Sequence, residues 1–184
     1  MNIFIFSLCL FILSIVEVFA EDCQSKATLF LNQPTYRNYL RLSSSKESDM
    51  CRFVIMRDSH HLAKLYRHTK QGNRWAIKLL IRNLSNLDGG ELEDAYRSLG
   101  ESINAEPRIL LWEFKEQRIT EDQFIQSVII LPLSFVDNKN GTLKALKNRK
   151  NKIRSIKDAK LGSQKKLAVN AINAQINKIN KLWP

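Results

Sequence analysis

The sequence contains few of the residues that interrupt helices. Only six glycines and four prolines occur in 184 residues, too few for a glycine-rich phosphate-binding architecture or for the many tight turns of a β-sandwich or barrel. The hydrophobic fraction of 44% is enough for a core of ordinary size. These proportions favour an all-α fold. Because the expected helices of about ten to sixteen residues are joined by short connections, they are predicted to pack as antiparallel helical hairpins.

Sequence motifs of enzymes and cofactor sites are also missing. There is no G-x-S-x-G, no Cys-x-x-Cys and no glycine-rich phosphate loop. The three histidines, His60, His61 and His68, do not have the i, i+4 or H-E-x-x-H spacing that zinc sites on helices use. We therefore predict no metal ion, no cofactor and no catalytic residue.

The amino-terminal segment is typical of an exported protein. Residues 3–16 are apolar except for two serines, and this run is shorter than the ~20 residues that span a bilayer. Val18 and Ala20 place small residues where signal peptidase requires them. We interpret residues 1–20 as a signal peptide and predict a periplasmic or secreted protein, with no transmembrane segment after cleavage. An uncleaved anchor is the alternative, because the segment has no Lys or Arg before its apolar run.

Two cysteines, Cys23 and Cys51, remain after that cleavage. An even number in an exported chain predicts one disulfide, which would stabilise the fold by about 3 to 4 kcal/mol by restricting the unfolded chain. The alternative is a reactive thiol, which needs a basic neighbour and a reducing compartment.

Charge divides the mature chain more sharply than any linker does. Residues 21–142 carry 17 basic and 16 acidic side chains, whereas residues 143–184 carry 12 basic side chains and one acidic residue, Asp158. We therefore distinguish a helical body domain, residues 21–142, from a basic amphipathic helical tail, residues 143–184. The cations predicted to bind a partner are Lys144, Lys147, Arg149, Lys150, Lys152, Arg154 and Lys157.

Apolar residues recur every three or four positions through the body, which predicts successive amphipathic helices. Gly72 ends the first, the Asp88-Gly89-Gly90 run separates the second from the third, and Pro107 opens the fourth. One shared core is expected to include Trp75, Leu84, Leu92, Leu99 and Phe124.

Other local signals complete the prediction for the body. Thr120 and Gln123 form a capping box ahead of the last body helix. Residues 27–31 and 36–42 are expected to be short helices. Residues 51–56 have a strand-like composition, but a buried helical turn is favoured because no partner strand is evident.

The tail is predicted to form two helices separated near Gly162. In the first, from residue 143 to 160, the cations surround most of the circumference. The second carries a continuous apolar stripe that has to be covered by the body, a second subunit or a membrane surface. This stripe consists of Val169, Ile172, Ile176, Ile179 and Trp183.

One stretch resembles a known group of proteins. The segment GNRWAIKL at 72–79, DGGELED at 88–94 and Leu99-Gly100 before Pro107 is similar to exported bacterial proteins of no assigned function. The similarity covers roughly forty residues. It implies a bacterial source and a HEAT-like array of helical hairpins, and no activity, substrate or catalytic residue.

Two groups of carboxylates are considered as functional sites, one as catalytic acids and one as a calcium site. Glu101 followed by Ser102 resembles the catalytic pair of lytic transglycosylases, without the downstream segment of those enzymes, and Glu113 could act as a second carboxylate. The densest acidic cluster lacks the alternating order of a calcium loop and is interpreted as a helix amino terminus. It consists of Asp88, Glu91, Glu93 and Asp94.

The sequence favours an exported, non-enzymatic binding protein, for example an immunity-type inhibitor of a toxin or a cell-wall enzyme. One alternative is a cell-wall hydrolase with Glu101 or Glu113 as the acid. Another is a protein that binds an anionic envelope surface through the basic tail. Nucleic acid ranks below a protein partner or an envelope surface, because residues 143–182 contain no aromatic side chain for base stacking. No pattern indicates an oligomeric state.

Overall fold

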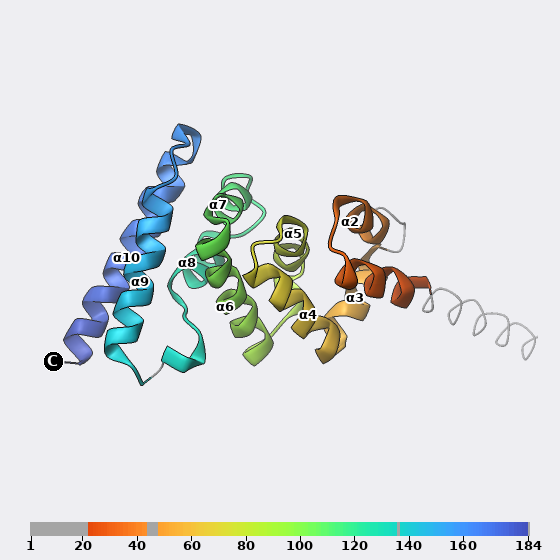
Figure 1. The fold of residues 1–184 in the computed structure, drawn as a ribbon, viewed down its shortest axis with the longest axis horizontal. Helices are drawn as coiled ribbons and strands as arrows, with labels where there is room; N and C mark the ends of the chain where they lie inside the picture. Colours follow the sequence, from red (N-terminus) through yellow and green to blue (C-terminus); the bar gives the residue numbers. More distant parts are fainter. Residues whose placement is uncertain (1–21, 44–47, 136, 184) are drawn as a thin grey trace, which may run out of the picture. The chain divides into compact units, whose positions relative to one another are not determined.

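The computed structural model describes residues 22–43, 48–135 and 137–183, and within these ranges it contains helices and no strand (Figure 1). The all-α prediction is confirmed. The finer prediction of a HEAT-like array is not. The proposed signal peptide lies outside the described residues. Within the described ranges, no helix is both long and apolar enough to cross a membrane.

A helical segment at residues 22–32 comes first. It is followed by α2 (Tyr36–Ser43), α3 (Ser48–Arg57), α4 (Ser59–Lys70), α5 (Arg74–Arg82), η1 (Leu84–Asn86), α6 (Gly89–Ala105), α7 (Pro107–Lys115), α8 (Glu121–Ile129), η2 (Leu133–Phe135), α9 (Lys139–Arg154), η3 (Ala159–Leu161) and α10 (Gly162–Leu182). The η elements are single 3-10 turns. The described residues divide into two compact units, one that ends at Lys64 and one that begins at Leu65.

The first unit is held together by the predicted disulfide. Cys23 and Cys51 are bonded and fully buried, and the bond joins the helical segment 22–32 to α3. Phe30 and Tyr39 are also buried in this unit, with their ring centroids 6.4 Å apart. Residues 51–56 belong to α3, so the strand-like composition reflects a buried helix face, as predicted.

Local signals placed most helix ends of the second unit correctly. The Thr120 hydroxyl accepts a hydrogen bond from the Gln123 backbone N–H, and the Gln123 side chain accepts one from the Thr120 N–H. The predicted capping box is therefore confirmed. Pro107 is the first residue of α7, where it costs no backbone hydrogen bond. Gly89 and Gly90, in contrast, form the first turn of α6 and do not lie in a loop.

The core of the second unit surrounds α6, which packs against α5, α7, α8 and α9. Leu99 on α6 and Phe124 on α8 are fully buried, and the Phe114 and Phe124 rings stack with centroids 4.3 Å apart. Leu84 is also buried, but Trp75 and Leu92 are only half-buried. The predicted core is therefore correct for three of its five members.

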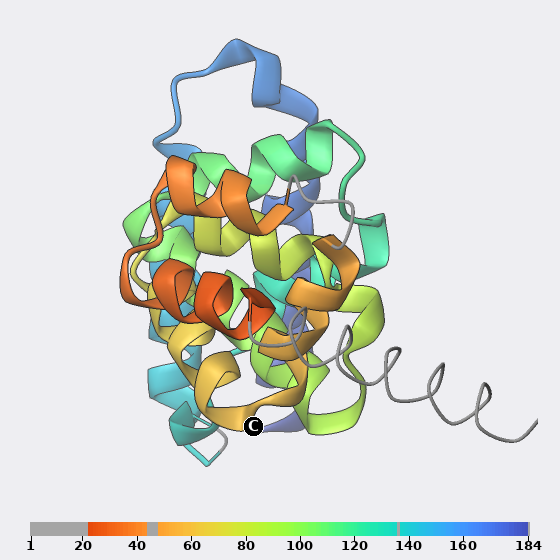
Figure 2. The same ribbon diagram turned by 90° about the vertical axis from the view of Figure 1, so that its right-hand side faces the viewer.

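The basic tail is part of this second unit. The change in charge at residue 143 falls inside α9, and α10 packs against α9, α8 and α7. Leu146, Ile153 and Ile172 are fully buried. Figures 1 and 2 show α9 and α10 side by side and antiparallel, and the turn between them lies at the end opposite the carboxyl terminus. The boundary in charge is therefore not a boundary in structure.

Candidate functional site

The outer face of α9 carries most of the cations predicted to bind a partner. Lys144, Lys147, Lys152 and Arg154 are exposed, and at 3.6 residues per turn they fall within an arc of about 160°. Leu146 lies on the opposite side and is buried. The expectation that cations surround most of this helix is wrong, because the inner face is part of the core.

Further exposed cations follow along the same hairpin. We call the whole set the basic surface, and it consists of Lys144, Lys147, Lys152, Arg154, Lys157, Lys160, Lys166, Lys178 and Lys181. None of these side chains forms an ion pair with a carboxylate among residues 22–43, 48–135 and 137–183. The basic surface is therefore a set of cations whose charge is left to solvent ions or to a partner.

Asp158 is the single acidic residue of this region, and it is already engaged. Its carboxylate accepts a hydrogen bond from the Lys160 backbone N–H at 3.0 Å and pairs with Arg108 at 3.0 Å. The Lys160 N–H, together with the Arg108 guanidinium, holds the pKa of Asp158 below its ordinary value. This carboxylate therefore neutralises Arg108 of α7 and leaves the lysines of the basic surface unpaired.

Two of the predicted binding residues are not available to a partner in the same way. Lys150 is half-buried, and its Nζ donates to Asn173 Oδ1 on α10 at 3.1 Å. Arg149 is only 2% exposed. Arg149 was predicted to bind a partner, but its side chain is buried on the same face of α9 as Leu146 and Ile153.

The Arg149 guanidinium closes the end of α8. Its Nη1 donates to the Val128 and Ile130 carbonyl oxygens, at 2.6 and 2.9 Å. Burial lowers the pKa of Arg149 to about 10. Gly100 of α6 makes the space, since a Cβ there would lie 2.4 Å from the Ser127 carbonyl oxygen and 2.8 Å from the guanidinium. The cation binds the carbonyl end of a helix, where the helix dipole favours positive charge.

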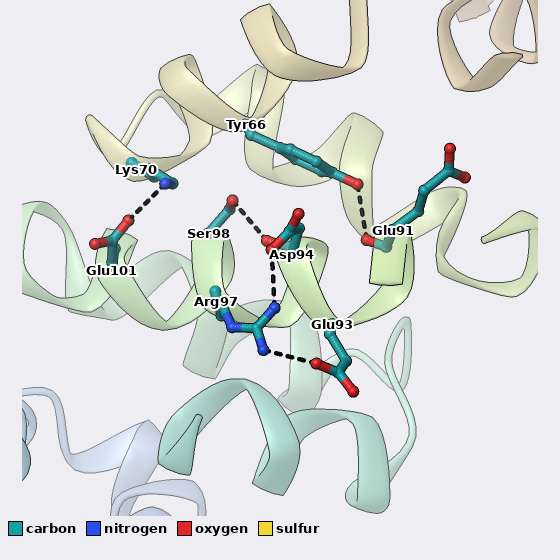
Figure 3. Close-up of polar contacts among 8 residues, drawn as sticks. All are labelled: Tyr66, Lys70, Glu91, Glu93, Asp94, Arg97, Ser98 and Glu101. Carbon is teal, nitrogen blue, oxygen red and sulfur yellow. Dashed lines mark hydrogen bonds and ion pairs between the residues drawn. The ribbon is translucent and has the colours of Figure 1, made fainter. Parts of the chain in front are cut away.

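The charges around α6 are arranged differently (Figure 3). Arg97 pairs with Glu93 at 2.6 Å and with Asp94 at 2.8 Å, one turn away on the same helix. Lys70 of α4 pairs with Glu101 at 3.1 Å. Two members of the acidic cluster, Glu93 and Asp94, therefore pair within α6, and Figure 3 shows their carboxylates directed at Arg97.

Tyr66 adds a link between α4 and α6. Its hydroxyl donates to the Glu91 carbonyl oxygen at 2.8 Å (Figure 3). Burial, with the neighbouring carboxylates of Glu91 and Asp94, raises the pKa of this phenol. The hydroxyl therefore stays protonated and remains a hydrogen-bond donor.

The two carboxylates considered as catalytic acids are not brought together at one cavity. Glu113 is buried, with Oε1 3.6 Å from Lys78 Nζ and Oε2 3.0 Å from Arg118 Nη1. It lines a groove of about 710 Å³ between α5 and α7, and Glu101 does not line this groove. Each carboxylate is paired with a cation. The other carboxylates that line the groove with Glu113 are Glu106 and Glu116.

His61 takes part in the start of α4, whereas His68 lies in the last turn of this helix. The Asp58 carboxylate accepts a hydrogen bond from the His61 backbone N–H at 2.9 Å, which caps α4, and this bond lowers the pKa of Asp58. In the part of the chain that the structure describes, no three His, Cys, Asp or Glu residues lie close enough to hold a metal ion.

An apolar groove that sequence patterns did not predict lies at the open end of the α9–α10 hairpin. It has a volume of about 310 Å³ and combines the chain that follows α8, the first turns of α9 and the end of α10. We call it the apolar groove, and its lining includes Leu131, Pro132, Phe135, Ile179, Leu182 and Trp183. The apolar stripe of α10 was the only sequence signal for it, because the other walls come from distant segments.

Comparison with known proteins identified no related protein. The chain matches no family model, no curated protein and no solved structure.

Proposed function

We propose that this protein is an exported, non-enzymatic binding protein that attaches to an anionic membrane surface through the basic surface. The observation that carries the proposal is the row of exposed cations on α9, η3 and α10, which have no carboxylate partner among the described residues. On α6, by contrast, Arg97 is paired locally with Glu93 and Asp94.

The energetics favour an extended anionic surface over a small ligand. The exposed cations are spread along α9, η3 and α10, so each contributes separately. A Lys or Arg near an anionic bilayer contributes about 1 kcal/mol, and this contribution disappears beyond a Debye length. Several such residues on one hairpin supply enough energy for reversible attachment.

Two features support the exported location. The sequence pattern of residues 1–20 is that of a signal peptide. The buried Cys23–Cys51 bond is of the kind that persists in oxidising compartments. A hydrolase that uses Glu101 or Glu113 gains no support, since each carboxylate is occupied by a neighbouring cation.

The test compares two triple variants with the same change in charge. One replaces Lys144, Lys147 and Lys152 of the basic surface by Gln. The control replaces Arg37, Arg41 and Arg67 by Gln, which are exposed elsewhere. Sedimentation with phosphatidylcholine vesicles, with and without phosphatidylglycerol, measures binding in about 0.05 M and about 0.3 M salt.

We expect the wild-type protein to bind only vesicles that contain phosphatidylglycerol, and more weakly in high salt. The basic-surface variant should lose roughly a hundredfold in affinity, because three cations at about 1 kcal/mol each are removed. The control should bind as the wild type does. Equal losses in both variants would refute attachment through the basic surface. Binding to a soluble acidic protein, such as an enzyme that this protein inhibits, without any binding to the vesicles would refute attachment to a membrane.

A further inference from the structure

Large apolar side chains are exposed to solvent at the rim of the apolar groove. Leu182 is 66% exposed and Trp183 is 38% exposed, and both line the groove at the end of α10. Leu133, in the segment between α8 and α9, is 64% exposed. A volume of about 310 Å³ lies within the range of small-molecule sites. The groove therefore offers an apolar ligand both an interior and an exposed apolar edge.

Cations stand beside the groove. Lys178 and Lys181 are exposed on the last turns of α10, next to the groove residues Ile179 and Leu182. Lys139 donates a hydrogen bond to the Trp183 carbonyl oxygen, which ties the end of α10 to the start of α9. A ligand that suits this site is apolar in the part that enters the groove and negatively charged in the part that lies next to the lysines.

A second copy of this chain does not meet that requirement. Residues 143–184 carry 12 basic side chains and one acidic residue, so pairing two copies through this end would set two cationic hairpins against each other. Like charges brought together oppose association. An anionic bilayer combines an apolar part with a negatively charged part, because its negative headgroups lie directly above its acyl chains.

We propose that the apolar groove receives an acyl chain of an anionic phospholipid while the basic surface contacts the headgroups. The inference rests on the proposed function and adds a specific insertion point to it. Trp183, which lines the groove, then reaches the boundary between headgroups and acyl chains, within the interface that tryptophan side chains favour in membranes. Binding has two parts, an electrostatic part that salt removes and an apolar part that salt leaves in place.

The experiment uses Trp183 as a reporter. The protein has three tryptophans, and replacing Trp75 and Trp112 by Phe leaves Trp183 alone. The matched control keeps Trp75 alone, by replacing Trp112 and Trp183 by Phe. Vesicles of phosphatidylcholine and phosphatidylglycerol with brominated acyl chains quench only a tryptophan that reaches the chains.

We expect quenching and a blue shift for Trp183 and neither change for Trp75. If vesicles sediment with the protein but Trp183 is not quenched, the groove proposal is wrong and the proposed function stands. If the protein does not sediment with anionic vesicles at all, the proposed function itself is wrong.

A second pair of variants tests the apolar contribution without the reporter. Leu182 is exposed, so Leu182→Gln should leave folding intact. It should weaken the salt-resistant binding by at least about tenfold, because a leucine side chain is no longer buried in lipid. Leu40→Gln, at an exposed leucine of the first unit, is the control and should change nothing. Unchanged salt-resistant binding in Leu182→Gln would contradict insertion at this groove.

Discussion

Helices α6 and α9 both carry many charges, but they use them in opposite ways. On α6, Arg97 is neutralised by Glu93 and Asp94, and Glu101 is neutralised by Lys70. On α9, the exposed cations have no carboxylate partner among the described residues. Unpaired like charges on one face repel each other and disfavour the compact state. The difference separates charge that serves the fold from charge that is available to a partner.

The same two helices are alike on their inner faces. Leu99 of α6 is fully buried, and so are Leu146 and Ile153 of α9. The helix that presents the basic surface is therefore also part of the core, and removing it tests more than binding.

Truncation before Lys139 should have the largest effect of any change considered. It removes Leu146, Ile153 and Ile172, each of which is fully buried and worth about 2 to 5 kcal/mol by comparison with deletions to alanine. Their sum reaches the total stability of an ordinary domain, about 5 to 15 kcal/mol. Residues 65–138 should lose cooperative thermal unfolding, as measured by far-UV circular dichroism. Retained protection of α6 amides in hydrogen exchange would show instead that α9 and α10 are dispensable.

A neighbouring pair on α9 tests whether its two faces differ as the structure indicates. Ile153→Ala should lower the free energy of unfolding by about 2 to 5 kcal/mol, because a fully buried side chain is cut back. Arg154→Ala, one residue further along on the exposed face, should change it by less than about 0.5 kcal/mol. Urea unfolding measures both. Equal losses would mean that α9 is not oriented as described.

The contrast between the faces of α9 also shows how far the sequence alone could lead. The 3.6-residue period and the capping box of Thr120 and Gln123 depend on neighbouring residues only, so the helices were predicted well. Arg149 was assigned to the surface because it is charged. Its spacing of three from Leu146 and four from Ile153 places it on the buried face, and that signal could have been used.

Other features required the folded chain. The apolar groove combines segments around Leu131, Thr142 and Ile179, which no local pattern connects. The space at Gly100 that admits the Arg149 guanidinium depends on contact between α6, α8 and α9. Which carboxylate pairs with which cation across helices, such as Lys70 with Glu101, is likewise a tertiary property.

Arg149 provides the next prediction, of intermediate size. Arg149→Met keeps an unbranched apolar stem but leaves the Val128 and Ile130 carbonyl oxygens without their donor. We expect a loss of about 1 to 3 kcal/mol in the free energy of unfolding, the cost of buried polar groups left without partners. The measurement is urea unfolding, with binding to anionic vesicles as a second observable that should stay unchanged. A variant as stable as the wild type would show that relief from burying the charge offsets the lost hydrogen bonds.

The smallest expected effect concerns the paired charges themselves. Lys70 and Glu101 are 47% and 27% exposed, and a pair of this kind contributes about 0.2 to 1 kcal/mol. A double-mutant cycle of Lys70→Met and Glu101→Gln should give a coupling energy in that range, and it should shrink as salt rises because solvent ions screen the pair. Lys152→Met on the basic surface should lose no stability at low salt, since removing it relieves repulsion among neighbouring cations. It should weaken binding to anionic vesicles, whereas Lys70→Met should not. The distinction between structural and available charge fails if Lys152→Met costs as much stability as Lys70→Met, or if both weaken binding equally.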